Sequence, residues 1–343
     1  MAQREPAEWV DLAKGRVVEV LTEQHSVVTA ELIARISEAG FRRSEVINID
    51  PTHVMTAAKE LTEEGVTTWA SEPTRGKRVV KTLQLADQRR TATVTARAAA
   101  RKRLLWTRYL SWAEGSARYP HGLIGPAGEA AARSAITESG IVIPLDPTRP
   151  QEVKTVLGVR VAGPLDSAGL IVPIEHGTAL GNPVVVLFEV KNLREWIYPH
   201  NEQLYQLLAK AVHVQRERPD TALVPVFIAR RTHFTLYRMA KQFGFLVIET
   251  ARQFIGEVEE TEMLEVRNGL QLHDLAVGSG PSLRVRDRLR GPIAKQVPIS
   301  APIWKQTALG REGTLLEAAR VATNDERDDL LNQLRHLRGG GGW

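Results

Sequence analysis

A glutamate and a lysine stand two positions apart directly after an apolar run. Val184 to Phe188 is continuously apolar, and Glu189, Val190 and Lys191 follow it. Such a run is typical of a strand that is buried on both faces of a sheet. Because side chains alternate between the two faces of a strand, Glu189 and Lys191 share one face and Val190 lies on the other. The pattern therefore predicts a carboxylate beside an ammonium at the rim of a buried sheet.

An aspartate upstream adds a second carboxylate. Asp166 lies at an expected turn between two short strands, and 22 residues separate it from Glu189. The chain contains one other Glu-x-Lys triplet, residues 152–154, which follows Asp146 after five residues. That triplet comes after a proline-containing turn and has no apolar strand before it. The context therefore favours the triplet that begins at Glu189.

Together, Asp166 and this triplet resemble the motif of the PD-(D/E)XK nuclease superfamily. The resemblance covers about residues 125–250, where helices are expected to alternate with short apolar strands. It implies an α/β, restriction endonuclease-like fold, with a mixed sheet flanked by helices. Gln203 and Tyr205 lie on the helix expected after the motif, where some members place a glutamine and a tyrosine, although the spacing differs.

The resemblance implies a role for each residue of the motif. Asp166 and Glu189, with the backbone carbonyl of Val190, would bind Mg²⁺ through hard oxygen ligands, and Mn²⁺ is an alternative ion. Lys191 would orient the nucleophile or stabilise the charged transition state. Glu129 matches an additional acid that many members carry on the helix before the first strand. The implied catalytic residues are Asp166, Glu189, Lys191 and Glu129.

Composition excludes several other chemistries. A chain of 343 residues with 43% hydrophobic and 25% charged residues is typical of a folded protein of two or three domains. It contains no cysteine, so disulfides, thiolate metal sites and cysteine nucleophiles are excluded. Its nine histidines lack the paired spacing of a zinc site. A phosphate-binding loop of the Gly-x-x-x-x-Gly-Lys-Ser/Thr type is absent, so any ATP-driven step would need a partner protein.

The sequence predicts no contact with a membrane. The first residues lack the pattern of a signal peptide, and no apolar run approaches the roughly 18 residues that a membrane-spanning helix needs. We therefore expect a cytoplasmic protein.

The first 85 residues predict three helices followed by a two-stranded hairpin. The expected helices span residues 8–24, 29–38 and 51–65, and the expected strands span residues 66–70 and 79–85. This order resembles the winged helix-turn-helix family, whose third helix enters the major groove of DNA. Arg75, Lys77 and Arg78 at the hairpin tip would then contact phosphates. Because the third helix is poor in cations, a role in protein contact or dimerisation is the alternative.

The following segment, residues 86–120, carries most of the excess positive charge. It holds eight basic and two acidic residues, in a chain of net charge +5, and predicts one long helix over residues 87–115. Aromatic residues interleave with the cations, which suits phosphate contact and base stacking. Arg101, Lys102 and Arg103 are the expected phosphate contacts. The alternative is a solvated linker helix whose aromatic residues pack on the next domain.

Beyond residue 260 the patterns are weaker. The sequence predicts a hairpin turn at Asn268-Gly269 and an interaction or covering helix over residues 312–338. In an extended segment over residues 284–290, alternating arginines would share one face, as a second phosphate strip or as a solvated edge strand.

These patterns define four expected segments and one expected function. The segments are a winged helix-turn-helix-like domain (1–85), a basic helical connector (86–120), a PD-(D/E)XK nuclease-like domain (121–260), and a hairpin and helical extension with a flexible tail (261–343). The expected function is a metal-dependent DNA nuclease that hydrolyses phosphodiester bonds, in restriction-like defence or DNA repair. The alternative is a non-catalytic DNA-binding or regulatory protein on an inactive nuclease-like scaffold. DNA is the expected partner, and homo-oligomerisation is left open.

Overall fold

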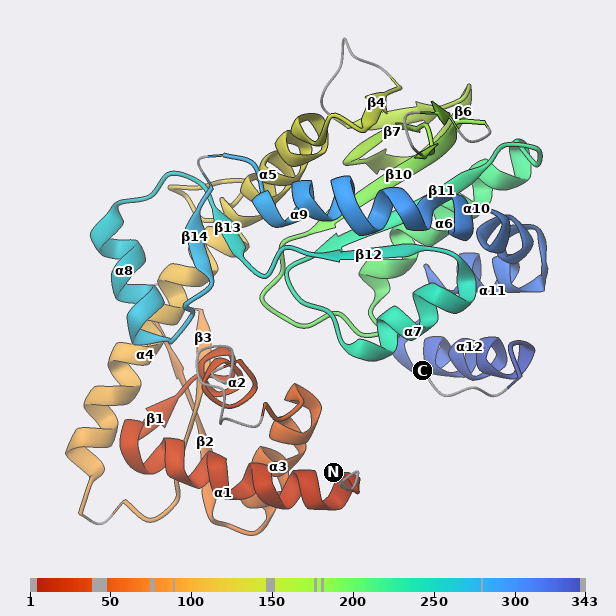
Figure 1. The fold of residues 1–343 in the computed structure, drawn as a ribbon. Helices are drawn as coiled ribbons and strands as arrows, with labels where there is room; N and C mark the ends of the chain where they lie inside the picture. Colours follow the sequence, from red (N-terminus) through yellow and green to blue (C-terminus); the bar gives the residue numbers. More distant parts are fainter. Residues whose placement is uncertain are drawn as a thin grey trace. The chain divides into compact units, whose positions relative to one another are not determined.

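A computed structural model gives the fold of the chain (Figure 1). The structure describes residues 5–38, 48–74, 78–88, 90–145, 152–175, 178–179, 182–278 and 280–339. The chain divides into two compact units. The first unit comprises Met1–Leu123 and Glu257–Leu275, and the second comprises Ile124–Gly256 and Ala276–Trp343. Within the described ranges, no helix combines the length and the apolar character that crossing a bilayer requires.

The first unit begins with helices around a small antiparallel sheet. Its elements are α1 (Pro6–Gln24), β1 (Ser26–Val27), α2 (Thr29–Ser37), α3 (Pro51–Glu63), β2 (Thr67–Pro73) and β3 (Val79–Leu85), and the strand order is β1-β3-β2. Helix α3 begins where Pro51 occupies its first turn and the Asp50 carboxylate accepts a hydrogen bond from Thr52 N. Val17, Leu32 and Leu61 belong to the core of this unit.

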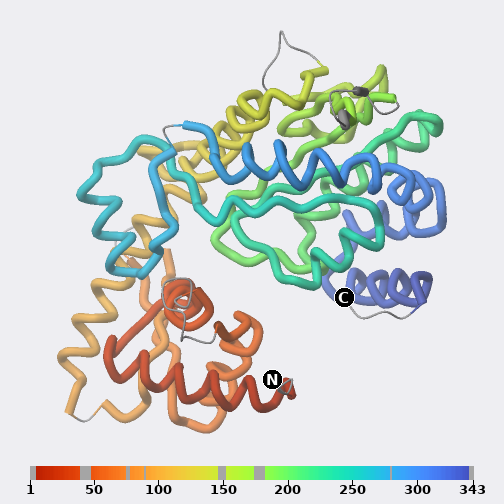
Figure 2. Tube along the Cα trace, viewed as in Figure 1, coloured from red at the N-terminus to blue at the C-terminus, as the bar shows by residue number. Residues whose placement is uncertain are grey.

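Two further helices complete the first unit, α4 (Ala92–Ala113) and α8 (Glu260–Gly269). Figure 2 shows α8, in light blue, beside α4, in orange, although they are far apart in the sequence. A Cβ atom at Gly269 would come within 2.4 Å of Leu105 Cδ1, so the Leu105 side chain packs closely against the end of α8. The predicted hairpin turn at Asn268-Gly269 is wrong, because both residues belong to the last turn of α8. Met263 and Val266, three residues apart, are buried on one face of this helix and stabilise it.

The second unit is built on a five-stranded mixed sheet of order β12-β11-β10-β7-β4. The strands are β4 (Val142–Pro144), β7 (Ser167–Ile171), β10 (Val184–Lys191), β11 (Leu223–Ala229) and β12 (Leu246–Glu249). β10, β11 and β12 run parallel, while β7 runs antiparallel to both β10 and β4. The expectation of an α/β chain with a mixed sheet is therefore confirmed.

Helices pack against both faces of this sheet (Figure 1). On one face, Val185 and Leu187 belong to a core shared with α6 (Glu202–Glu217), α7 (Phe234–Phe243), α11 (Arg311–Ala319) and α12 (Asn324–Leu337). On the other face, Val186 and Phe188 belong to a core shared with α5 (Ile124–Ser139), α9 (Leu283–Arg288) and the first half of α10 (Ala294–Leu309). The central strand is therefore covered on both sides, as its apolar sequence predicts.

Within the described residues, three short two-stranded sheets lie outside the central sheet. They pair β5 (Val153–Val156) with β6 (Val159–Leu165), β8 (Ile174–Glu175) with β9 (Thr178–Ala179), and β13 (Gln253–Ile255) with β14 (Leu275–Val277).

The arginine-rich segment near the C-terminus is helical. Helix α9 continues through a π-helical turn (Leu289–Ile293) into α10. Val285, Leu289 and Ile293 are spaced four residues apart and are all buried. This spacing stabilises a helix, so the predicted extended strip over residues 284–290 is wrong.

Candidate active site at the end of the central strand

Strand β10 places Glu189 and Lys191 on the same face of the central sheet. Val185 and Leu187, which precede Glu189 at intervals of two, pack on the α6 side, whereas Val190 packs on the α5 side. Lys191 Nζ donates a hydrogen bond of 2.9 Å to Glu189 Oε1. The prediction that these two side chains share one face is therefore confirmed.

Asp166 reaches the same strand from the turn between β6 and β7. Its backbone N donates to Phe188 O at 3.2 Å, and Val190 N donates to Asp166 Oδ2 at 2.6 Å. The antiparallel pairing of β7 with β10 produces this contact, because it sets Ser167 opposite Phe188. The structure thus brings Asp166 next to the Glu189-Val190-Lys191 segment.

A second lysine shares the Glu189 carboxylate. Lys210 on α6 donates to Glu189 Oε2 at 2.9 Å and to Pro164 O at 2.5 Å. Glu189 and Lys210 are 4% and 7% exposed, so this is a buried ion pair. Each carboxylate oxygen of Glu189 therefore accepts a hydrogen bond from an ammonium group. The sequence analysis missed Lys210, although a lysine within the apolar stretch Leu207 to Val212 is a signal for a paired buried charge.

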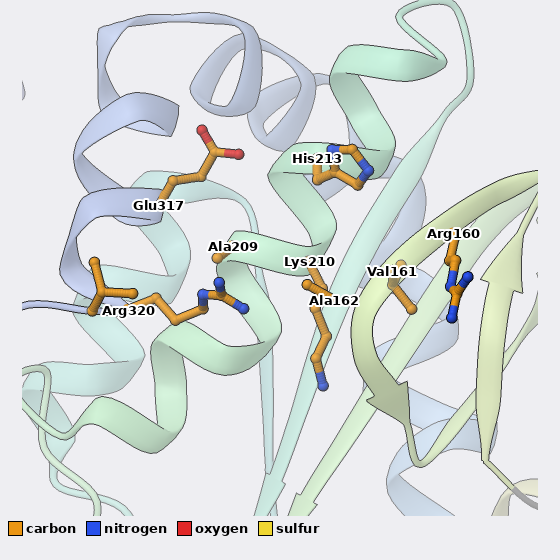
Figure 3. A pocket seen from close by; sticks show the side chains of 9 residues that line it. Arg160, Val161, Ala162, Ala209, Lys210, His213, Glu317 and Arg320 are labelled. Atoms are coloured by element: carbon orange, nitrogen blue, oxygen red, sulfur yellow. The ribbon is translucent and has the colours of Figure 1, made fainter.

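Lys210 also lines an open pocket of about 540 Å³ on the second unit (Figure 3). In Figure 3 its side chain leaves α6 toward the strand that carries Val161 and Ala162. Arg160 and Arg320 line the same pocket. The pocket is therefore lined by several cations and by Glu317, and it shares Lys210 with the candidate site.

The charge of Asp166 is disfavoured by its surroundings. Burial, followed by the negative charge of Glu189, raises the pKa of Asp166 to about 6. The hydrogen bond from Val190 N and the charge of Lys191 act in the opposite direction, and the charge of Glu129 adds a smaller increase. An added cation at this position would stabilise the ionised carboxylate.

Glu129 influences this site through its charge. It stands on α5, and its Oε2 lies 3.5 Å from Arg133 Nη1. Glu129 is therefore paired with Arg133 on the same helix, and its negative charge contributes to the raised pKa of Asp166.

A buried asparagine ties helix α5 to the end of β10. Asn192 Nδ2 donates to Ile124 O and to Phe254 O, both at 2.6 Å, and Asn192 Oδ1 accepts from Phe254 N at 3.1 Å. A Cβ atom at Gly128 would come within 2.3 Å of Asn192 Cβ. The glycine that precedes Glu129 thus lets α5 approach the strand end closely.

The chemistry of the donors fits a hard divalent cation. Asp166, Glu189 and the Val190 carbonyl offer oxygen atoms, which Mg²⁺ and Mn²⁺ prefer. Within the described part of the chain, no group of three or more His, Asp or Glu side chains is arranged to hold an ion. An ion that bound Glu189 would compete with the ammonium groups of Lys191 and Lys210.

The helix after the motif contributes packing. The Tyr205 hydroxyl is buried and donates to Pro199 O at 2.7 Å, and burial raises the pKa of Tyr205. Tyr205 therefore holds the loop before α6 in place through this hydrogen bond. Gln203, also implied by the resemblance, has its Oε1 atom buried without a hydrogen-bond partner.

The residues predicted to contact DNA are dispersed in the first unit. Arg75 and Lys77 lie outside the described residues. Arg78 Nη2 lies 3.2 Å from Glu114 Oε2. Arg101 is exposed on α4.

Lys102 and Arg103 do not form a free phosphate-binding strip. Lys102 is 7% exposed and donates to Glu31 Oε1 at 2.5 Å and to Gly269 O at 2.7 Å. Burial lowers the pKa of Lys102, and Glu31 opposes this effect. Arg103 Nη2 lies 2.5 Å from Glu72 Oε2. Long-range carboxylates therefore pair with both cations in this structure, and their contact with phosphates stays a prediction.

Two of the three aromatic residues of α4 are buried, and the third stacks on one of them. Tyr109 and Trp112 are buried, and Trp106 stacks on Tyr109 with ring centroids 4.7 Å apart. These rings therefore stabilise the helix packing.

Searches against family models, curated proteins and solved structures return no match for this chain. A functional proposal must therefore rest on the geometry of its own side chains.

Proposed function

We propose that this protein is a metal-dependent nuclease of the PD-(D/E)XK type that hydrolyses phosphodiester bonds in DNA. The observation that carries the proposal is the 2.6 Å hydrogen bond from Val190 N to Asp166 Oδ2. It joins an aspartate at a strand turn to the Glu189-x-Lys191 triplet, although 22 residues separate Asp166 from Glu189.

The order of elements around the site also supports this proposal. α5, β4, β7, β10, α6 and β11 follow one another in the α-β-β-β-α-β order of the superfamily core. The small β5–β6 and β8–β9 pairs are additions to this order. A shared order of elements argues for a scaffold, and the charged residues argue for its chemistry.

The residues of the site have separate roles in this proposal. Asp166, Glu189 and the Val190 carbonyl would hold Mg²⁺ or Mn²⁺, which when bound supplies a Lewis acid and lowers the pKa of a ligated water. Lys191, whose side chain is 20% exposed, can reach a substrate phosphate and offset its developing charge. Lys210 is a positioning residue, because its buried ammonium fixes the orientation of Glu189.

In the same proposal the first unit holds DNA as a winged helix-turn-helix-like module. The order α1-β1-α2-α3-β2-β3 and the sheet order β1-β3-β2 support this role. The wing is the β2–β3 hairpin, whose register pairs Pro73 with Val79.

One observation favours the alternative of an inactive scaffold. Both oxygens of Glu189 are hydrogen-bonded to ammonium groups, which neutralises the carboxylate without a metal ion. A protein that retained the fold without metal binding would keep this arrangement.

A nicking assay on supercoiled plasmid with Mg²⁺ or Mn²⁺ separates the two functions. The nuclease proposal expects cleavage that Asp166→Ala and Lys191→Ala abolish, while DNA binding is retained. Glu152→Gln and Lys154→Ala are matched controls, because they change the other, solvent-exposed triplet. Cleavage that survives equally in the Asp166 and Lys191 variants, or that is insensitive to a chelator, would overturn the proposal.

A further inference from the structure

Two loops leave the central sheet at the same edge as the candidate active site. Residues 192–201 follow β10, and residues 230–233 follow β11. The two strands are parallel and in register, with Lys191 opposite Ala229, so both loops start beside Lys191. A bridge between Ile197 and Thr232 joins them again further on.

Four aromatic rings from these loops and the start of α7 form one cluster, which we call the aromatic platform: Tyr198, His200, His233 and Phe234. Tyr198 stacks with His200 at a centroid distance of 5.4 Å and an interplanar angle of 8°. It also stacks with His233 at 4.9 Å and 23°. Phe234 lies 4.2 Å from the His233 ring and is 55% exposed. The platform therefore offers ring surface to solvent.

Arginine side chains lie over rings at this edge. The Arg238 guanidinium is 4.9 Å from the centre of the Phe234 ring, and the Arg231 guanidinium is 5.7 Å from the centre of the Trp196 ring. A ring beside a cation suits a ligand that has both a flat base and a phosphate.

The backbone under the platform is held by hydrogen bonds between the two loops. Ile197 N donates to Arg231 O at 3.0 Å, and His233 N donates to Ile197 O at 2.8 Å. Arg230 is 1% exposed, and its guanidinium donates to the carbonyls of Leu193 and Arg194. A buried arginine thus fixes the start of the first loop.

Side chains from two helices hold the end of the first loop. The Tyr205 hydroxyl donates to Pro199 O at 2.7 Å, and Arg327 Nη1 on α12 donates to His200 O at 3.2 Å. Tyr198 N donates to Asn201 Oδ1 at 2.6 Å. The rings are therefore set in place before a ligand arrives, which lowers the entropy cost of binding.

We propose that the aromatic platform binds unpaired bases of a nucleic acid strand beside the candidate active site. Stacking on a ring needs a free face of a base, which a single strand offers and the interior of a duplex does not. Arg231 and Arg238 add positive charge at this edge, which favours a nucleic acid strand. This inference rests on the proposed nuclease function and narrows its substrates to strands with unpaired nucleotides next to the bond that is cleaved.

Fluorescence anisotropy with the full chain tests the platform in the presence of a chelator, so that binding is measured without cleavage. The probes are a labelled single-stranded DNA oligonucleotide, its duplex, and an abasic strand of the same length. Phe234→Ala and His200→Ala should each weaken single-strand binding by about five-fold or more. Phe234→Trp, which keeps a ring, should retain it. Ile299→Ala removes an exposed apolar side chain from α10 and is the matched control.

The abasic strand separates stacking from charge. It carries the phosphates without the bases, so the wild type should bind it more weakly and Phe234→Ala should weaken that binding no further. Equal affinity of wild type and Phe234→Ala for the single strand would overturn the platform, whereas duplex binding also reports on the first unit and decides nothing about the rings. If the protein binds single strands through these rings and cuts no DNA, the nuclease proposal fails and the platform stands. If it cuts DNA and the ring variants bind and cut normally, only the platform fails.

Discussion

Lys210 Nζ lies 2.9 Å from Glu189 Oε2, so a helix residue 21 positions away shares this carboxylate with Lys191. The two ammonium groups differ in their surroundings. The Lys191 side chain is 20% exposed, and that of Lys210 is 7% exposed. Lys191 is therefore accessible to a substrate, whereas Lys210 acts inside the protein.

This difference predicts that Lys210 contributes more to stability than Lys191. Lys210→Met leaves a buried carboxylate with one partner fewer, which should lower the free energy of unfolding by roughly 3–5 kcal/mol. Lys191→Met should lower it less, because water reaches that position. Urea unfolding of both variants measures the difference. In a Glu189→Gln background, Lys210→Met should lower the free energy of unfolding much less than it does in the wild type. An equal decrease in both backgrounds would contradict the prediction.

The raised pKa of Asp166 predicts an unusual dependence of stability on pH. Its folded-state pKa of about 6 exceeds the ordinary 3.8, so the folded protein binds more protons than the unfolded chain between these values. The free energy of unfolding contributed by this group therefore falls as pH rises through that window, by about 3 kcal/mol. Asp166→Asn should remove this decrease and make the chelator-treated protein more stable at neutral pH.

Urea unfolding across that pH window checks the Asp166 prediction. Asp220→Asn, which changes a fully exposed carboxylate, is the control. The same pH dependence in wild type and Asp166→Asn would show that the prediction is wrong.

The contact between Gly128 and Asn192 predicts that a larger residue at position 128 destabilises the protein. Gly128→Ala would place a Cβ atom 2.3 Å from Asn192 Cβ and should lower the free energy of unfolding by about 1–3 kcal/mol. Gly125→Ala on the same helix is the matched control, because nothing lies within 4 Å of its Cβ position. Thermal unfolding compares the two, and an equal response to both substitutions would contradict the contact.

The solvent-facing side of α4 predicts how this helix would bind DNA. Val94, Arg97, Arg101 and Leu104 are exposed and spaced three or four residues apart, so they share one face. Arg97→Gln with Arg101→Gln should reduce the salt dependence of DNA binding. The log–log slope should fall by about 0.9 for each duplex phosphate that the variant no longer neutralises, or by about 0.7 for each phosphate of a single strand.

Lys102, a buried cation on the same helix, provides the control for that experiment. Lys102→Met should lower the free energy of unfolding, because it leaves Glu31, which is 0% exposed, without this ammonium. It should leave the salt dependence of binding unchanged. An unchanged slope in the Arg97 and Arg101 variant would exclude α4 from the DNA-binding surface.

Local patterns in the sequence predicted the elements that carry the candidate site. The apolar run Val184 to Phe188 predicted a doubly buried strand, and the period of two predicted that Glu189 and Lys191 share a face. Both features depend on residues that are neighbours in the chain. The same local reasoning was wrong at Asn268-Gly269. The dipeptide is typical of a hairpin turn, but burial of Met263 and Val266 on one face stabilises a helix that includes it.

Tertiary structure alone decided which charges are paired. Lys102 pairs with Glu31, which is 71 residues away in the sequence, and Lys210 on helix α6 pairs with Glu189 on strand β10. It also decided that loops after β10 and β11 gather the rings of the aromatic platform at one edge. The physical reason is that hydrophobic periodicity fixes which face of an element is buried, whereas an ion pair or a ring stack depends on the distance between segments that the fold brings together.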